Sequence, residues 1–351
     1  IYETTTARYI QDDGSMNTSP VWNTSMEWGK KTVSLYAYLG LTGNRQYTFK
    51  VMATNGAGTQ SAFSETISIL TLANTPNIMW VGNSTTTTLE VSVYTSPNDY
   101  SGNTEETLYA IEETTTGKFL QTNGTLATDT VWNTRNNWNA KTVTDLNNAT
   151  EYNFRSIATN NDEKRTLPGP AKSLFTLAVI PEAPALSGVT TNTAQISINP
   201  ATNPSNVEFA IYMVNERLFV QSNGELGNSP IWQTKALWGE TIIQGLSPNN
   251  NYSISVGARN GNNVETARGE QTSITTLANI PLPPDLYVYS YTDKLRCYVV
   301  LSGNPQNTEF AIQDSISGKY LQPNGYLSET PEWKTRNGWQ AATQEILGLQ
   351  P

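Results

Sequence analysis

Tryptophans are the most regularly spaced side chains in this sequence that could form a binding surface. Eight of the nine tryptophans form four pairs, six residues apart, that close blocks of equal length. The pairs are Trp22 and Trp28, Trp132 and Trp138, Trp232 and Trp238, and Trp333 and Trp339. A tryptophan ring can fill a core or, when exposed, stack on a sugar ring. One exposed ring per block, repeated along a chain, would give avidity for a polymer.

Burial separates these two interpretations of the pairs. Because their register has no gaps, we expect the pairs to fill the core, with the first tryptophan of each pair in an equivalent and mostly buried place. These first members are Trp22, Trp132, Trp232 and Trp333. A sugar platform would instead require one ring of each pair to present a flat face to water.

Catalytic chemistry has few candidate groups in this chain. It has no histidine and one cysteine, which excludes Ser-His-Asp and Cys-His relays, histidine-bound zinc and disulfide frameworks. We interpret the carboxylates of Asp12–Asp13, Glu112–Glu113 and Asp162–Glu163 as solvated turn charges that do not repeat between blocks. Cys297 aligns with inward strand positions, so we expect a buried, unreactive thiol. The sequence therefore predicts no enzymatic activity, no catalytic residue, no cofactor and no metal.

Charge and composition limit the partners of the chain. Its formal net charge is -9 and its lysines and arginines do not cluster, which argues against a nucleic-acid surface. No apolar run reaches the 18 or so residues of a membrane span. Threonine and asparagine make up roughly a quarter of the residues, a composition that favours strands and tight turns over helices. These features are typical of an exported, β-rich protein.

Internal repeats position the tryptophans. The segment Thr-Leu-Ala recurs at 71–73, 176–178 and 276–278, and each copy is followed within three residues by proline. A period of about 100 residues is that of one β-sandwich domain. The tryptophan blocks start at Ile1, Ile111, Ile211 and Ile312 and carry an Asp-Gly or Asn-Gly pair. This pair is a strong hairpin signal, and we expect a type I′ turn at each.

A tyrosine marks the later part of each unit. Tyr47, Tyr152 and Tyr252 each follow a leucine by six residues and begin a stretch in which apolar residues alternate with polar ones. A strand with one buried face has this pattern. The spacing is similar to the tyrosine corner of immunoglobulin-like sandwiches, in which the phenol bonds back to the preceding turn. We expect these three tyrosines to have that structural role.

Taken together, the proline-containing linker, the seven-strand spacing, the tyrosine corner and the Ala-x-Asn ending of each unit resemble a fibronectin type III domain. The glutamine, Asn-Gly and paired-tryptophan block is similar to a bacterial subtype found in tandem arrays on secreted and surface proteins. The resemblance implies an all-β fold of tandem antiparallel β-sandwich domains arranged as a rod.

Four repeats follow from this resemblance. Repeat 1 is a partial repeat over residues 1–76, repeat 2 (77–181) and repeat 3 (182–281) are complete, and repeat 4 is a partial repeat over 282–351. The chain starts inside a strand of one repeat and stops before the corner tyrosine of another. We therefore expect it to be a window from a longer polypeptide whose repeats continue on both sides.

The repeats predict a non-enzymatic structural or adhesive protein, forming an extracellular filament, stalk or adhesin shaft at a bacterial cell surface. Its partners would be neighbouring repeats of the same or an identical chain, and a surface polysaccharide or a ligand on a host or neighbouring cell. An alternative is an array of carbohydrate-binding modules, or the accessory region of a secreted polysaccharide-active enzyme. Exposed tryptophans would favour this alternative.

Overall fold

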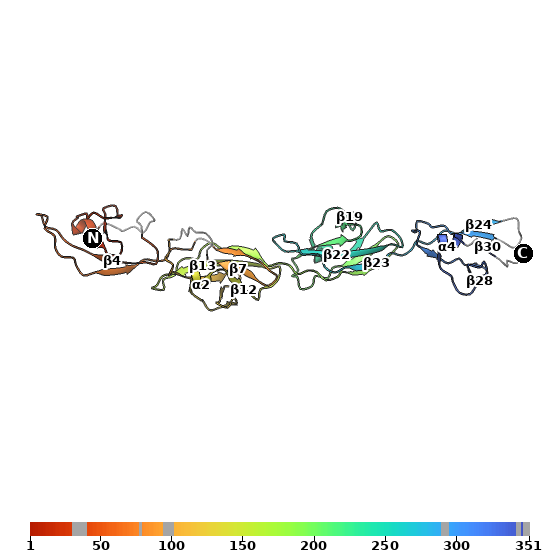
Figure 1. The fold of residues 1–351 in the computed structure, drawn as a ribbon, viewed down its shortest axis with the longest axis horizontal. Coiled ribbons are helices and arrows are strands. Elements are labelled where there is room, and N and C mark those ends of the chain that lie inside the picture. The colour runs from red at the N-terminus through yellow and green to blue at the C-terminus, as the bar shows by residue number, and fades with distance from the viewer. Residues whose placement is uncertain (30–40, 77–78, 94–101, 289–294, 342–344, 347–351) are drawn as a thin grey trace. The chain divides into compact units, whose positions relative to one another are not determined.

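Nearly all of the regular secondary structure in the described residues consists of antiparallel strands (Figure 1). The computed structural model describes residues 1–29, 41–76, 79–93, 102–288, 295–341 and 345–346. The chain divides into two compact units, Ile1–Leu177 and Ala178–Pro351. The division lies close to the predicted boundary between repeats 2 and 3, and the finer division into four repeats stays a prediction.

The first unit holds repeats 1 and 2. The elements of repeat 1 are β1 (Tyr2–Glu3), β2 (Arg8–Ile10), β3 (Met16–Asn17), α1 (Ser25–Trp28), β4 (Gln46–Lys50) and β5 (Ile67–Leu70). Those of repeat 2 are β6 (Trp80–Gly82), β7 (Leu89–Ser92), β8 (Leu108–Glu113), β9 (Lys118–Leu120), β10 (Leu126–Ala127), β11 (Asn133–Thr134), α2 (Arg135–Trp138), β12 (Lys141–Val143), β13 (Glu151–Thr159) and β14 (Lys172–Phe175).

Repeat 2 is a sandwich of two sheets. One sheet has the order β12-β7-β6, and the other β10-β9-β8-β13-β14 with β11 added beside β8. The core takes side chains from both sheets, since Leu89 and Val91 of the first pack with Ile111, Leu120 and Phe154 of the second. Over most of its length β13 alternates buried and less buried residues, as expected for a strand that lies on a core with one face.

The second unit repeats this arrangement. The elements of repeat 3 are β15 (Ala185–Ser187), β16 (Ala194–Ser197), β17 (Glu208–Met213), β18 (Leu218–Val220), β19 (Leu226–Gly227), β20 (Gln233–Thr234), α3 (Lys235–Trp238), β21 (Glu240–Ile243), β22 (Asn251–Arg259) and β23 (Thr272–Thr275). Its sheets have the orders β15-β16-β21 and β19-β18-β17-β22-β23, with β20 beside β17. Strand for strand, this is the order of repeat 2.

Repeat 4 supplies the remaining elements. They are β24 (Asp285–Val288), β25 (Leu295–Tyr298), β26 (Glu309–Phe310), β27 (Tyr320–Leu321), β28 (Leu327–Ser328), β29 (Lys334–Thr335), α4 (Arg336–Ala341) and β30 (Glu345–Ile346). A small core here contains Val299, Phe310, Leu321 and Trp339. The corner region of this repeat falls on residues 347–351, outside the described residues.

The Asn-Gly hairpins differ from the expected type I′ turn. The Gly124 amide donates to the Gln121 carbonyl at 3.0 Å, and the Gln121 amide to the Thr125 carbonyl at 2.8 Å. Only Gly124 of the Asn123–Gly124 pair has a positive φ, +91°. This is a three-residue loop with a type I turn and a glycine bulge. The prediction was wrong because the φ of Asn123 is not positive, and its side chain accepts from the Thr125 amide at 3.1 Å.

Candidate functional site

The second tryptophan of the pair lies in the core in repeats 2 to 4. Trp138 is 1 % exposed, and its indole Nε1–H donates to the Tyr109 carbonyl at 2.7 Å. Trp238 and Trp339 repeat this bond, to Phe209 at 2.8 Å and Phe310 at 2.7 Å. Because a buried indole nitrogen needs an acceptor, this bond fixes where the ring can sit. In repeat 1 the equivalent Trp28 is half-buried.

A one-turn helix carries each buried ring inward. In α2 the side chain of Thr134 caps the helix by accepting from the Asn137 amide at 3.3 Å, and Thr234 does the same in α3 for the Leu237 amide at 3.4 Å. The caps satisfy an amide of the first turn that has no partner inside so short a helix. The helix therefore starts at a fixed residue, which sets the tryptophan four residues on.

The first tryptophan of each pair is not a core residue. Trp22 is 39 % and Trp333 59 % exposed, and Trp132 and Trp232 are half-buried. The prediction of mostly buried rings was wrong for Trp22 and Trp333. The space between the sheets is already occupied by the second tryptophan in repeats 2 to 4. In repeat 3 the first ring lies against Gly257, which alternates with the core residues Val256 and Ala258 and so faces away from the core.

An arginine guanidinium lies over one face of the first ring in each of the two complete repeats. The guanidinium of Arg165 lies 5.2 Å from the Trp132 ring centroid, and that of Arg259 lies 4.9 Å from the Trp232 centroid. Arg259 also pairs with Glu208, with a nitrogen–oxygen distance of 2.6 Å. A guanidinium stacked on a ring and held by a carboxylate restricts the ring to one orientation.

Tyr47, Tyr152 and Tyr252 make the hydrogen bond that the sequence predicts for a tyrosine corner. The phenol oxygen of Tyr47 accepts from the Thr42 amide at 2.7 Å, that of Tyr152 from the Asn147 amide at 2.9 Å, and that of Tyr252 from the Ser247 amide at 2.7 Å. The donor lies five residues before the tyrosine each time, so the bond closes the turn that precedes the strand.

Buried carboxylates are a feature that the sequence interpretation missed. Glu113 is fully buried, not solvated, and accepts from the Thr115 amide at 3.0 Å, the Thr116 amide at 2.9 Å and the Thr116 hydroxyl at 2.7 Å. Glu3 accepts the same set from Thr5 and Thr6. The signal was present, because Glu-Thr-Thr-Thr occurs at 3–6 and 113–116. These carboxylates therefore do repeat between blocks.

The hydrogen bonds decide the charge of these carboxylates. Burial by itself would raise the pKa of Glu113, but the bonds from Thr116 and Thr115 outweigh it and hold the pKa below its ordinary value. In the same way burial opposes, and the bonds from Thr6 and Thr5 lower, the pKa of Glu3 to about 2. Both groups are charged at neutral pH and serve a turn, which is a structural role and not acid catalysis.

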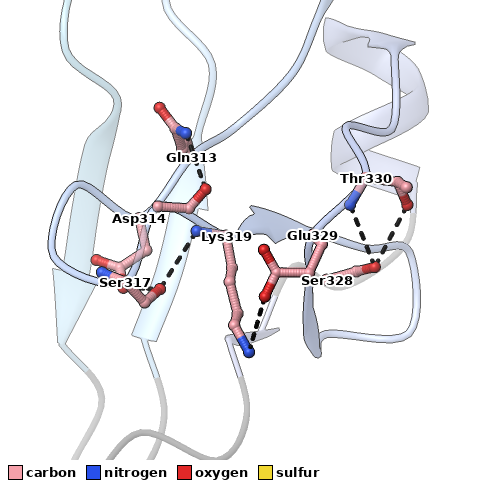
Figure 2. Close-up of polar contacts among 8 residues, drawn as sticks. Gln313, Asp314, Ser317, Lys319, Ser328, Glu329 and Thr330 are labelled. Atoms are coloured by element: carbon pink, nitrogen blue, oxygen red, sulfur yellow. Dashed lines mark hydrogen bonds and ion pairs between the residues drawn. The ribbon is translucent and has the colours of Figure 1, made fainter.

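Repeat 4 contains an exposed version of this turn (Figure 2). Asp314 accepts from the Ser317 amide at 3.0 Å and from its hydroxyl, and these bonds lower the pKa of the carboxyl. Nearby, Lys319 Nζ lies 3.3 Å from a carboxylate oxygen of Glu329. Repeat 3 has Met213 at the corresponding position, fully buried and unable to accept these bonds.

An asparagine side chain makes two hydrogen bonds to the backbone of the residue that follows each Thr-Leu-Ala segment. The Asn203 side chain accepts from the Val179 amide at 2.8 Å and donates to the Val179 carbonyl at 2.7 Å. The same two bonds join Asn103 to Asn74 and Asn304 to Asn279, at 2.7 to 2.9 Å. An amide that pairs with both backbone groups of one residue removes the rotation of the linker at that residue.

Adjacent repeats within a unit also share side-chain hydrogen bonds. The Asn44 side chain donates to the Thr107 hydroxyl at 3.2 Å and accepts from the Asn161 amide at 2.9 Å, which joins repeats 1 and 2. Asn249 donates to the Thr308 hydroxyl at 2.8 Å and joins repeats 3 and 4. Asn44 and Thr107 are buried at 3 % and 0 % exposure, so their bond is shielded from water.

Cys297 lies in the core of repeat 4. It is 2 % exposed, and burial raises the pKa of its thiol to about 11. A protonated, buried thiol is a poor nucleophile.

No group of three or more metal-binding side chains occurs among the described residues. In the part of the chain that the structure describes, no helix has the length and apolar character to cross a membrane.

An apolar cleft of about 960 Å³ lies on repeat 1, lined by residues that include Ile10, Tyr47, Phe49 and Ile69. In repeat 2 the corresponding sheet face packs with β6 and β7 through Phe154 and Leu174. The cleft thus has the composition of a sandwich interior rather than that of a small-molecule site.

The fold is fibronectin type III-like. No family model and no curated protein matches the chain. Among solved structures, it is similar to the FN1-FN3 domains of chicken CNTN1, with 15 % identity over 68 % of this chain and 77 % of that one and a TM-score of 0.25. It is also similar to a two-domain fibronectin type III segment of chicken tenascin, with 15 % identity over 58 % of this chain and 100 % of that one and a TM-score of 0.33. The fold assignment stands on the sheet pairing and the shared core described above.

Proposed function

We propose that the chain is a non-enzymatic structural and adhesive repeat protein that forms part of an extracellular filament, stalk or adhesin shaft at a bacterial cell surface. The observation that carries this proposal is the repeated fastening of the linker residue by Asn103, Asn203 and Asn304. A shaft needs domains that fold independently and linkers that resist bending. The repeated sandwiches support the first requirement, and the asparagine bonds to the residue after each Thr-Leu-Ala segment support the second.

The buried charges support a load-resisting role over a catalytic one. Glu3 and Glu113 use their oxygens on backbone amides of their own turns. Two charged pairs, Arg155–Glu112 in repeat 2 and Arg259–Glu208 in repeat 3, connect neighbouring strands of one sheet. Carboxylates and guanidinium groups that are engaged in such hydrogen bonds and ion pairs stabilise a domain and are not arranged for proton transfer.

Solution scattering and surface labelling test the proposal. Small-angle scattering of the whole chain is expected to show a rod in which each complete repeat adds about 30–40 Å, from strands of up to about ten residues at roughly 3.3 Å each. Antibodies against the chain should label intact cells of the source bacterium. A compact scattering envelope would contradict the shaft, and labelling only after permeabilisation would contradict the cell-surface location.

The alternative, a carbohydrate-binding array or the accessory region of a polysaccharide-active enzyme, draws support from the exposed rings of Trp22 and Trp333. An array predicts that every repeat contributes to polysaccharide retention. Binding that falls in equal steps as each first tryptophan is replaced by alanine would favour the array. Binding that depends on one tryptophan alone would exclude it.

A further inference from the structure

A cleft of about 390 Å³ lies beside Trp232 in repeat 3. Phe219, Trp232 and Gly257 form its apolar part, and Glu265 and Arg268 supply its polar groups. The volume falls within the roughly 300–1,000 Å³ of small-molecule sites. Phe219 and Gly257 lie on β18 and β22, Trp232 lies in the segment just before β20, and Glu265 and Arg268 lie in the segment between β22 and β23. All five residues belong to repeat 3, so the cleft needs no neighbouring repeat.

A glycine keeps this cleft open. Gly257 pairs with Ala210 in the β17–β22 register, and the corresponding pair in repeat 2 is Ala110 with Ile157. A Cβ atom at Gly257 would lie 3.9 Å from both Trp232 and Arg268, which is ordinary contact. The backbone thus tolerates a side chain here, and a branched one would extend into the space beside the tryptophan. Repeat 2 carries that branched side chain.

The rings of the cleft are held in place by the arginines around them. Arg259 lies over the Trp232 ring and is itself paired with Glu208. The Arg268 guanidinium lies 3.5 Å from the centroid of Tyr212, whose ring is 5.0 Å from that of Phe219. A rigid aromatic surface loses little entropy when a ligand stacks on it.

The polar side chains at the rim keep hydrogen-bonding groups that the protein does not use, although the Arg268 guanidinium lies over the rings of Tyr212 and Phe219, 3.5 Å and 5.8 Å from their centroids. Neither Arg268 nor Glu265 has a side-chain hydrogen bond or ion pair with any residue that the structure describes. A guanidinium offers paired donors and a carboxylate paired acceptors, and together they carry no net charge. A ligand for this rim therefore needs adjacent donors and acceptors and no charge of its own.

We propose that this cleft binds one ring of a neutral saccharide. A pyranose has an apolar C–H face, which suits Trp232 and Phe219, and a rim of adjacent hydroxyls, each donor and acceptor, which suits Arg268 and Glu265. Repeat 2 lacks this site, because it has Ile157, Arg165 and Pro168 in place of Gly257, Glu265 and Arg268. It stands whether or not the chain is a shaft.

Calorimetric titration of the whole chain with a panel of hexasaccharides tests this site. The probes are the neutral hexamers of glucose, xylose, mannose and N-acetylglucosamine, with hexagalacturonate as the charged comparison. At least one neutral hexamer is expected to bind saturably. Trp232→Ala and Gly257→Ile should each weaken that binding tenfold or more, and Trp132→Ala should leave it unchanged. Gly257→Ile installs the residue of repeat 2, so circular dichroism and the melting temperature should stay close to those of the parent.

The following results would contradict the proposed saccharide site. Failure of all four neutral hexamers to bind, or binding of hexagalacturonate alone, excludes a neutral saccharide. Full binding by Gly257→Ile in a folded chain excludes the cleft. If that variant does not fold, Arg268→Ala replaces it, because this exposed side chain supports no strand pairing. Arg268→Ala is expected to weaken binding at least tenfold, and unchanged binding contradicts the proposal.

Discussion

The indole nitrogen of Trp238 donates to the carbonyl oxygen of Phe209 at 2.8 Å, across 29 residues of chain. Phe209 lies on β17, which pairs with β22 on one side and β20 on the other. One bond therefore ties the short helix α3 to the central strand of the larger sheet. Repeats 2 and 4 contain the same bond, so in repeats 2 to 4 it connects the short helix to the strand that carries the acceptor carbonyl.

Replacing the buried ring should destabilise its repeat strongly. For Trp138→Ala in repeat 2 we expect a loss of about 3–5 kcal/mol in the free energy of unfolding, because the change leaves a large cavity and removes the hydrogen bond from the indole to the Tyr109 carbonyl. Hydrogen exchange of peptides from β8 and β13 measures this within the whole chain. The matched control is Trp132→Ala, a half-buried ring outside the core, with an expected loss of less than about 2 kcal/mol. Equal losses in the two variants would contradict the different roles of the pair.

The free energy of unfolding should fall at acidic pH more strongly in repeat 2 than in repeat 3. The folded pKa of Glu113 is below its ordinary value, so the charged carboxylate stabilises the folded state. This contribution is fully present above the ordinary value near 4.5 and is lost as pH falls from there through the folded pKa. Exchange protection in β8 and β13 from pH 6 to pH 3 should therefore fall more than that in β17 and β22, where Met213 replaces the carboxylate.

Glu113→Gln is the control for the acid dependence. The variant should be less stable than the parent at pH 6, and the difference should narrow as the pH falls, because the parent loses its charged acceptor. A difference that stays constant across this range would show that the carboxylate does not titrate with folding.

The junction between repeats 3 and 4 should depend on Asn249. Asn249→Gly keeps the left-handed backbone, φ 45°, and removes the side chain that donates to Thr308. A double-mutant cycle with Thr308→Val is expected to give a coupling energy of about 0.5–1.5 kcal/mol in exchange protection across the junction. Asn215→Gly, in an exposed turn of repeat 3, should show no coupling to Thr308→Val. Additive effects of the first pair would mean that the bond does not join the repeats.

Cys297 should resist modification in the folded chain. Its thiol is 2 % exposed with a pKa of about 11, so at pH 7 it is both protonated and shielded. Reaction with a chromogenic disulfide reagent is expected to be at least tenfold slower than in the urea-unfolded chain. Stoichiometric labelling of the native protein at the unfolded rate would place the thiol at the surface.

The sequence by itself determined the features that depend on local chain properties. The alternation after Tyr152 and Tyr252 predicts strands with one buried face, and the structure has nine-residue strands there. The gapless blocks predict the same supersecondary unit in each repeat, and the pairing of β8 with β9 matches that of β17 with β18. Such signals need only the residues next to them, because turns and strand faces are set by neighbours in the chain.

Tertiary structure decided which of these residues lie inside. Identical spacing does not tell Trp132 from Trp138, because the choice depends on a carbonyl 29 residues from the buried ring, at Tyr109. Glu113 lies on β8 against β13 and accepts from the Asn153 amide at 3.4 Å, 40 residues along the chain, and the cleft beside Trp232 exists because a glycine on β22 lies against it. Burial and open space depend on segments that meet only after folding. The type and spacing of a residue therefore limit its possible roles, and contacts with segments distant in sequence determine which role it has.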